Sequence, residues 1–286
     1  MSQTKILNIA LIGNGKTGSK VEELINEEKN YAHKKLNLIG PFNTRNKIEN
    51  NLDELSKADV VIVFTPASAI DFLCPYLLDA NKMVLWGCTG YNWEEKKHIL
   101  EIELNKKNLL WIYASNFSLM MNLIKELITT SKKFLPLYQQ PFSNNNGNGD
   151  ENKNESENKR DDRLKISIKE IHHIHKKDVP SGTALLWKEW FQKQKNNISS
   201  NISIESIRED DVVGIHELTI ESKYEKIKIV HESKDRRLFA EGALWGARKL
   251  SEIVNETNSS GLLNFNDFVL KYLYLSTNPS LNSTLT

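Results

Sequence analysis

Short apolar runs recur through the first part of the chain, and each is followed by a polar or glycine-containing segment. They are Ile6–Ile12, Leu36–Ile39, Ala58–Phe64, Met83–Trp86 and Leu109–Tyr113. Continuous apolar runs of this length are typical of strands whose two faces are both covered, as in a parallel sheet. Helical patterns lie between the runs, and the first has Val21, Leu24 and Ile25 at helical spacing. The alternation predicts an α/β fold with a doubly wound parallel sheet.

A different pattern follows in the second part of the chain. Apolar and polar residues alternate in four segments, Lys165–Ile171, Ile202–Ile207, Ile215–Ile220 and Lys226–His231. Period-two alternation is typical of strands with one covered face. Helical patterns accompany them at Leu119–Phe134 and Ala184–Phe191. We therefore predict a second, α+β domain with a mixed or antiparallel sheet.

The two patterns set the predicted domain boundaries. The first domain is residues 1–117, and residues 240–275 return to complete it with a helix and a short closing segment, Gly261–Phe268. The second domain is residues 118–239. The polar tail from Ser276 is expected to be frayed.

One stretch of the second domain differs sharply in composition. Residues 139–163 contain almost no apolar side chain after Phe142 and are rich in asparagine. Such a segment buries too little apolar surface to offset the entropy cost of ordering it. We predict a disordered surface insertion there.

Charge and cysteine content narrow the class of protein. The 38 Lys and Arg residues nearly balance the 37 Asp and Glu residues, which argues against nucleic acid or an anionic membrane as the main partner. Cys74 and Cys88 lie in separate segments, so a disulfide framework is not indicated and a reducing compartment is favoured. Because no apolar run approaches the roughly 20 residues that span a bilayer, we expect a soluble, cytoplasmic protein.

The turn after the first strand carries a nucleotide-binding pattern. It reads Gly13-Asn14-Gly15-Lys16-Thr17-Gly18, and the glycines have the spacing G-x-G-x-x-G between a strand and a helix. In this context the glycines allow a pyrophosphate to approach the helix N-terminus closely, as in Rossmann-type folds. Ligands of such sheets bind at the carboxyl ends of the strands, where Gly13, Thr65, Gly87, Thr89, Ala114 and Asn116 are predicted. The alternative is a strand-to-helix turn that binds no ligand.

The choice between NADH and NADPH depends on the end of the second strand. NAD-binding domains usually place an acid about 20 residues after the glycines, where it holds the ribose hydroxyls. No acid occurs from Lys34 to Ile48, but Arg45 follows the strand. Arg45 could face a 2′-phosphate, which would favour NADPH, or it could simply be solvated.

The most chemically informative stretch is Glu170–Ala184, which reads EIHHIHKKDVPSGTA. It joins a predicted strand to a predicted helix, with Ser181 at the N-cap position and Gly182 in the first turn. Unpaired N–H groups and a partial positive charge make a helix N-terminus a suitable place for an anion. Several proton donors precede it: His172, His173, His175, Lys176 and Lys177. The stretch therefore predicts a site that holds a small acid and can protonate it.

Two other interpretations of this stretch compete with the acid-binding site. One is a solvated basic loop before an ordinary capped helix. The other is a metal site, since His173 and His175 would share one face of a strand. No second cluster supplies further ligands, and the adjacent lysines would repel a cation, so we predict no metal.

At these residues the chain resembles the dihydrodipicolinate reductase family. The family motif E-x-H-H-x-x-K-x-D-x-P-S-G-T-A matches Glu170–Ala184, and further similar segments occur in the same order along the chain. They are GNGKTG from Gly13, GCTG from Gly87, ASNFS from Ala114 and HESKDRRLFAEGA from His231. The resemblance covers nearly the whole chain except the predicted insertion.

The resemblance implies a reaction and a set of roles. It implies that NADH or NADPH reduces a cyclic imine dicarboxylate in lysine and diaminopimelate biosynthesis, in a homotetramer assembled through the substrate domain. His172 and Lys176, both expected on the loop, would be the proton-donating pair. The substrate would be bound by His173, Ser181, Gly182 and Thr183. Beside the glycine turn, the cofactor would be lined by Gly87, Cys88, Thr89, Ala114, Ser115, Asn116 and Phe117.

The chain departs from the family pattern at three positions. Cys88 replaces a threonine of the G-T-T-G turn, Ser115 replaces Ala or Pro, and Val179 replaces Ala before the proline. These changes alter packing more than chemistry. A function of another class stays open, namely a non-catalytic module that senses NAD(P) and has lost turnover.

Overall fold

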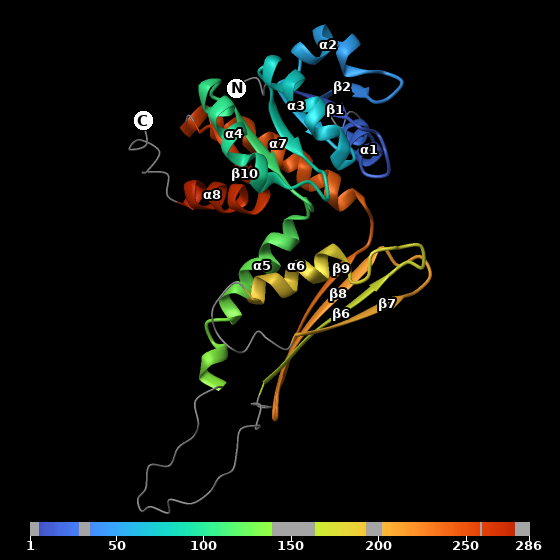
Figure 1. Cartoon of the computed structure of the whole chain (residues 1–286), viewed down its shortest axis with the longest axis vertical. Helices are drawn as coiled ribbons and strands as arrows, with labels where there is room; N and C mark the ends of the chain where they lie inside the picture. Colours follow the sequence, from blue (N-terminus) through green and yellow to red (C-terminus); the bar gives the residue numbers. More distant parts are fainter. Residues whose placement is uncertain (1–5, 29–34, 139–163, 193–201, 258, 278–286) are drawn as a thin grey trace, which may run out of the picture. The chain divides into compact units, whose positions relative to one another are not determined.

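A computed structural model of the chain describes residues 6–28, 35–138, 164–192, 202–257 and 259–277. The insertion predicted at 139–163 and the tail beyond residue 277 lie outside the described residues. The chain divides into two compact units, Met1–Leu119 with Asp235–Thr286, and Met120–Lys234 (Figure 1). None of the helices in the described ranges is long and apolar enough to cross a bilayer.

The first unit is built on a six-stranded sheet in the order β10-β5-β4-β3-β1-β2. Its strands are β1 (Leu7–Ile12), β2 (Leu36–Phe42), β3 (Val60–Val63), β4 (Met83–Trp86), β5 (Leu110–Tyr113) and β10 (Gly261–Asn264). All neighbouring strands pair in parallel, which confirms the predicted α/β class. The order reverses at β1, because β2 lies on one side of it and β3 on the other. The parallel pairing puts all carboxyl ends at one edge of the sheet, and the reversal of the order creates a topological switch point between β1 and β3.

Helices cover both faces of this sheet. They are α1 (Gly18–Glu28), α2 (Leu52–Ser56), α3 (Ile70–Asp79), α4 (Trp93–Lys106), α7 (Arg237–Thr257) and α8 (Phe265–Thr277), with short 3₁₀ turns at Ile48–Asn50 and Ala67–Ala69. Side chains from α1, α7 and α8 form one core with the sheet, and those from α2, α3 and α4 form the other. All four residues of β3 are fully buried between these layers. This two-sided burial explains the continuous apolar runs of the sequence.

The C-terminal part of the first unit contains more regular structure than the sequence pattern predicts. Gly261–Phe268 is predicted as a short closing segment. Instead, Gly261–Asn264 forms the edge strand β10, paired in parallel with β5, and α8 runs on to Thr277. Four residues are too few to show a strand pattern, so the pairing with β5 supplies what the local sequence lacks.

The second unit is a four-stranded sheet in the order β7-β6-β8-β9, with two helices packed against it. The elements are α5 (Leu119–Ser131), a 3₁₀ turn at Leu135–Tyr138, β6 (Leu164–His172), α6 (Gly182–Gln192), β7 (Ser203–Arg208), β8 (Gly214–Ser222) and β9 (Lys226–Ser233). β6 pairs in parallel with β7 and antiparallel with β8, so the sheet is mixed, as predicted. Figure 1 shows α5 and α6 side by side on one face of the sheet.

Strand β6 carries the alternation that positions the site. Ile166 and Ile168 face the helices and are buried, and the same inward side continues with Glu170 and His172. The apolar core under α6 thus gives way to two polar side chains at the carboxyl end of the strand. Both need polar partners, because buried polar groups are costly when they are unpaired.

Candidate active site

The segment that follows β6 leads directly into the first turn of α6. Ser181 is the N-cap residue, as predicted: its Oγ accepts the N–H of Ala184 at 3.2 Å, and its carbonyl accepts the N–H of Leu185 at 3.0 Å. Gly182 begins the helix with open space where a Cβ would lie. His173 and Thr183 are half-buried on either side of this loop. The first turn of α6 is therefore accessible to a ligand.

Glu170 is the buried anion beneath this loop, with no exposed surface. Both of its carboxylate oxygens lie 3.0 Å from the backbone N of Ser181. Burial alone raises the pKa of Glu170, but hydrogen bonds from Ser181 and Ser206 and the nearby His172 outweigh it and hold the pKa below its usual value. Glu170 is therefore ionised at neutral pH, and its carboxylate accepts hydrogen bonds from groups inside the protein.

His172 is the last residue of β6, not a loop residue as the sequence suggested. It is buried, with 6% of its surface exposed, because it continues the inward side of the strand. Its Nδ1 lies 3.6 Å from Glu170 Oε2. Burial lowers the pKa of His172, with Lys176 and Arg208 adding to the effect and Glu170 opposing it. The imidazole is consequently neutral at pH 7, and replacing it with alanine would open a cavity.

Lys176 lies on the loop and faces the exposed carboxylate of Asp178. Its Nζ is 2.8 Å from Asp178 Oδ1. The Asp178 carboxylate also accepts a hydrogen bond from the backbone N–H of Gly182, the first residue of α6. Although burial opposes the change, these contacts hold the pKa of Asp178 below its usual value. One carboxylate thus bridges the predicted proton donor and the predicted anion-binding turn.

Two further residues of the cluster come from strands distant in sequence. His216 in β8 is 4% exposed, and its Nε2 lies 3.1 Å from Ser181 Oγ. Burial lowers the pKa of His216 to about 3, so it is neutral. Arg208 at the end of β7 lies 3.5 Å from Glu170 Oε1. Sequence reasoning missed both, although a histidine at an inward position of an alternating strand is a detectable signal.

Glu170, His172 and His216 also offer ligand atoms that lie within 4.8 Å of one another among the described residues. This group differs from the pair considered in the sequence, because His173 and His175 follow β6 in a turn and do not share a strand face. Their rings are 6.4 Å apart. The carboxylate of the buried group already accepts the Ser181 N–H and faces the cation of Arg208, so these residues form an internally neutralised network.

The glycine turn of the first unit has the geometry that a pyrophosphate requires. Gly13 has φ +88° and donates its N–H to Phe42 O at 2.8 Å, which joins the ends of β1 and β2. A Cβ on Gly18 would lie 1.9 Å from the carbonyl oxygen of Gly13, so α1 packs directly on the turn. Gly15 has open space around it, and Asn14 and Lys16 are exposed beside it. These residues fit a dinucleotide at the start of α1.

The corner after β2 brings Asn14 and Arg45 into one network. Asn43 Oδ1 accepts the backbone N–H groups of Arg45 at 2.9 Å and Asn46 at 3.0 Å. Asn43 Nδ2 in turn donates to Asn14 Oδ1 at 3.3 Å. Arg45 is exposed in this corner. The uncharged amides here replace the acid that NAD-binding domains usually carry.

The remaining predicted cofactor residues lie at the carboxyl ends of β3, β4 and β5. Thr65 Oγ1 is 3.7 Å from Cys88 Sγ, and burial raises the pKa of the Cys88 thiol, which makes it a packed residue and a poor nucleophile. Thr89 and Ser115 are exposed at this edge. Ala114 is buried, and its N–H donates to the carbonyl of Trp86 at 2.9 Å.

Three of these residues also have clear packing roles. A Cβ on Gly87 would lie 2.2 Å from the Phe64 ring, so this glycine makes room for that side chain. Phe117 is 1% exposed, with its ring centroid 4.8 Å from that of Phe265. Asn116 Oδ1 accepts the backbone N–H of Ser118 at 2.8 Å, which shapes the turn before α5.

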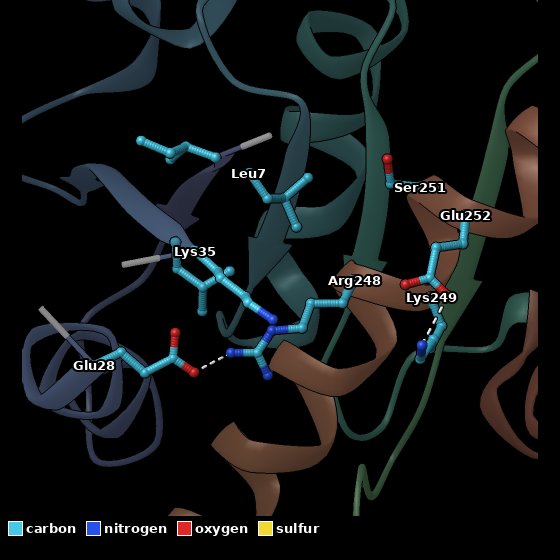
Figure 2. A pocket seen from close by; sticks show the side chains of 9 residues that line it. Leu7, Glu28, Lys35, Arg248, Lys249, Ser251 and Glu252 are labelled. Carbon is cyan, nitrogen blue, oxygen red and sulfur yellow. Dashed lines mark hydrogen bonds and ion pairs between the residues drawn. The ribbon is translucent and has the colours of Figure 1, made fainter. Parts of the chain in front are cut away.

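A cavity of about 580 Å³ lies at the amino ends of β1 and β2, opposite the carboxyl ends of the strands where the glycine turn lies (Figure 2). It is lined by Ile6, Leu7, Glu28, Lys35, Leu36, Arg248, Lys249, Ser251 and Glu252. Its lining includes two ion pairs, Arg248 with Glu28 and Lys249 with Glu252. Because it adjoins the amino ends of β1 and β2, it is separate from the edge where the glycine turn lies.

Comparison with known proteins identifies both parts of the chain. Residues 7–117 match the family model described as dihydrodipicolinate reductase, N-terminus, and residues 154–269 match the corresponding C-terminus model. A 4-hydroxy-tetrahydrodipicolinate reductase from Christiangramia forsetii is 31% identical over 258 residues, covering 86% of this chain and 93% of the relative. The enzyme of that name from Pelagibacter ubique is 28% identical over 271 residues, covering 86% of this chain and 93% of its own length.

Solved structures show the same fold. A dipicolinate-bound dihydrodipicolinate reductase from Paenisporosarcina sp. TG-14 superposes with a TM-score of 0.64 at 16% identity, covering 92% of this chain and 99% of that one. A diaminopimelate dehydrogenase from C. glutamicum gives a TM-score of 0.51 at 10% identity, covering 92% of this chain and 94% of that one. The two family models together span both units of the fold. The chain belongs to the dihydrodipicolinate reductase family.

Proposed function

We propose that the protein catalyses the NAD(P)H-dependent reduction of 4-hydroxy-tetrahydrodipicolinate to tetrahydrodipicolinate, a step of lysine and diaminopimelate biosynthesis. The observation that carries this proposal is the joint placement of His172, Lys176 and the open first turn of α6. A cationic donor beside a helix N-terminus suits a dicarboxylate that must accept a proton. Family membership supports the same reaction.

The proposed roles follow from the positions of the side chains. His173, Gly182 and Thr183 surround the start of α6 and would hold the substrate carboxylates, with the helix N-terminus adding a favourable field. Ser181 is assigned to this site by the motif, and its buried hydroxyl shapes the turn as the N-cap. Lys176 would donate the proton, and the neutral His172 beside it would relay or stabilise that proton.

The residues assigned to the cofactor are Gly13–Gly18, Arg45, Thr65, Gly87–Thr89 and Ala114–Phe117. The reduced nicotinamide supplies a hydride when bound. The open backbone at Gly15 and the N-terminus of α1 would hold the pyrophosphate. The sheet edge formed by β3, β4 and β5 would orient the remainder of the molecule.

A direct assay tests this function. The purified protein, NADPH or NADH and enzymatically generated substrate should give a loss of absorbance at 340 nm that depends on the substrate. A protein that binds the reduced cofactor but never oxidises it would instead be the sensing module considered above. Comparing kcat/KM for the two cofactors belongs to the same experiment.

We further infer that NADPH is used at least as well as NADH. The support is the cluster of amides after β2 and the exposed Arg45, in place of an acid. Arg45→Ala should lower kcat/KM for NADPH and leave that for NADH nearly unchanged. Lys47→Ala is the matched control, since Lys47 is an exposed cation two residues away. A strong native preference for NADH would contradict this inference.

We also infer a cytoplasmic homotetramer assembled through the second unit. Edge strand β9 exposes Ile227 and Val230, with 58% and 55% of their surface accessible, which supports contacts between copies. Two buried free cysteines are compatible with a reducing compartment. Sedimentation equilibrium should give four times the 32.9 kDa chain mass, and a monomer would contradict the assembly.

A further inference from the structure

The segment between β6 and α6 has no hydrophobic anchor of its own. None of residues 173–180 is buried, and its apolar members Ile174 and Val179 are 60% and 62% exposed. Burial of apolar surface therefore cannot fix the shape of this loop. Its conformation must come from polar contacts with the surrounding structure.

Arg208 makes such contacts from the end of β7. Its Nη2 donates to the carbonyl of Asp178 at 2.6 Å, and its Nε lies 3.4 Å from the carbonyl of Lys176. A third donor, Nη1, reaches the carbonyl of Ile207 at 2.8 Å and fixes the side chain on its own strand. The side chain is 19% exposed. One guanidinium thus binds the loop at two backbone positions around the predicted proton donor.

The same guanidinium connects this loop to the buried end of the site. Arg208 Nη2 is 3.5 Å from Glu170 Oε1, and Glu170 receives the N–H of Ser181 on both oxygens. The Arg208–Glu170 pair therefore joins the Lys176–Asp178 turn to the start of α6. Only a planar fork with several donors can satisfy these acceptors together, which a lysine ammonium on a flexible stem cannot do.

We propose that Arg208 is a positioning residue, which acts through Glu170 and the loop carbonyls to hold Lys176 in its proton-donating position. This inference rests on the proposed function. A misplacement of about 1 Å in a catalytic group can cost about 10²-fold in rate. Arg208 does not itself touch the substrate in this proposal, so its loss should change kcat while cofactor affinity stays constant.

Two substitutions and one control test the proposal. Arg208→Met removes all the donors, and Arg208→Lys keeps the charge opposite Glu170 but loses the fork. We expect kcat to fall by about 10²-fold in the first variant and by less in the second. Lys226→Met removes an exposed ion pair with Glu221 at the far end of the same sheet, and should leave kcat unchanged.

Hydrogen exchange gives a readout that does not require activity. Amides in the peptide that covers residues 173–184 should exchange faster in both Arg208 variants, whereas those of β6 and β8 should stay protected. If Arg208→Met fails to fold, Arg208→Lys carries the test. Native exchange in this peptide together with native kcat in the folded variants would overturn the proposal. A wild-type protein without reductase activity would refute the proposed function, and the exchange data would then decide whether Arg208 holds the loop.

Discussion

Lys176 is held by Asp178 on an exposed loop, so removing its side chain should not disturb a core. Lys176→Ala should lower kcat by about 10²–10⁴-fold, the usual contribution of a general acid. This corresponds to roughly 3 to 5 kcal/mol of transition-state stabilisation. The midpoint of thermal unfolding and the Kd for NADPH should barely change. Lys177→Ala is the control, and a Lys176→Ala enzyme with native kcat would remove this residue from the mechanism.

His216 should make stability depend on pH. Its pKa is about 6.5 in an unfolded chain and about 3 in the folded protein, so between these values the unfolded state binds more protons. The associated stability is present above pH 6.5 and is lost as the pH falls toward 3, by up to about 1.4 kcal/mol per pH unit. The buried His172 and the half-buried His231, whose pKa values are also lowered by desolvation, act in the same direction.

The measurement is urea unfolding between pH 7 and pH 5. The variant His216→Gln places a non-titrating amide near Ser181 Oγ. Its slope of unfolding free energy against pH should be smaller than that of the wild type. An unchanged slope would mean that His216 is not held neutral in the folded protein. The slope is informative even if the substitution lowers stability at every pH.

At the residue scale, the sequence shows the members of one contiguous motif better than their partners. Lys176, Gly182 and Thr183 are predicted because helix and loop chemistry is local. Arg208 and His216 are missed because their contacts arise only when β7 and β8 flank β6. A detectable clue existed in Glu170, a charge at an inward position of an alternating strand, which requires a hidden cationic or hydrogen-bonding partner.

At the scale of elements, two glycines of the turn before α1 are expected to differ in role, Gly18 in packing and Gly15 in ligand binding. A methyl group on Gly18 would collide with the Gly13 carbonyl, so Gly18→Ala should lower the thermal midpoint. Gly15→Ala meets nothing within the protein and should keep the native midpoint while weakening NADPH binding, measured by fluorescence titration. Equal effects of the two substitutions on stability would contradict the geometry of this turn.

Elements with long or regular patterns were predictable, and elements that depend on a distant partner were not. Runs of apolar residues predict β1 and β3, because both faces of these strands are covered. β10 has only four residues, two of them half-exposed, and its identity comes from pairing with β5. The loop position expected for His172 was wrong for a similar reason, since strand pairing with β7 extends β6 to this residue.

At the scale of the whole molecule, deletion tests whether the predicted insertion is needed for folding and activity. The family matches end at residue 117 and resume at residue 154, so Asn144–Lys153 lies outside both. Deleting these ten residues should leave the thermal midpoint and kcat nearly native, because loop length changes closure entropy only slowly. The longer deletion Asn144–Asp161 should behave alike. Loss of folding or assembly in either variant would make the segment structural.

The carboxylate of Asp178 is a counter-ion already present in the proposed substrate site. It pairs with the ammonium of Lys176, the proposed proton donor, and accepts the first N–H of α6, which the substrate carboxylate would also need. In the proposed site, substrate binding would replace one carboxylate with another at this helix N-terminus, so few new ion pairs would form. Affinity for the substrate should therefore respond only weakly to ionic strength. An unrelated anion would likewise have to displace Asp178 from these contacts, which limits how strongly it can compete for the proposed site.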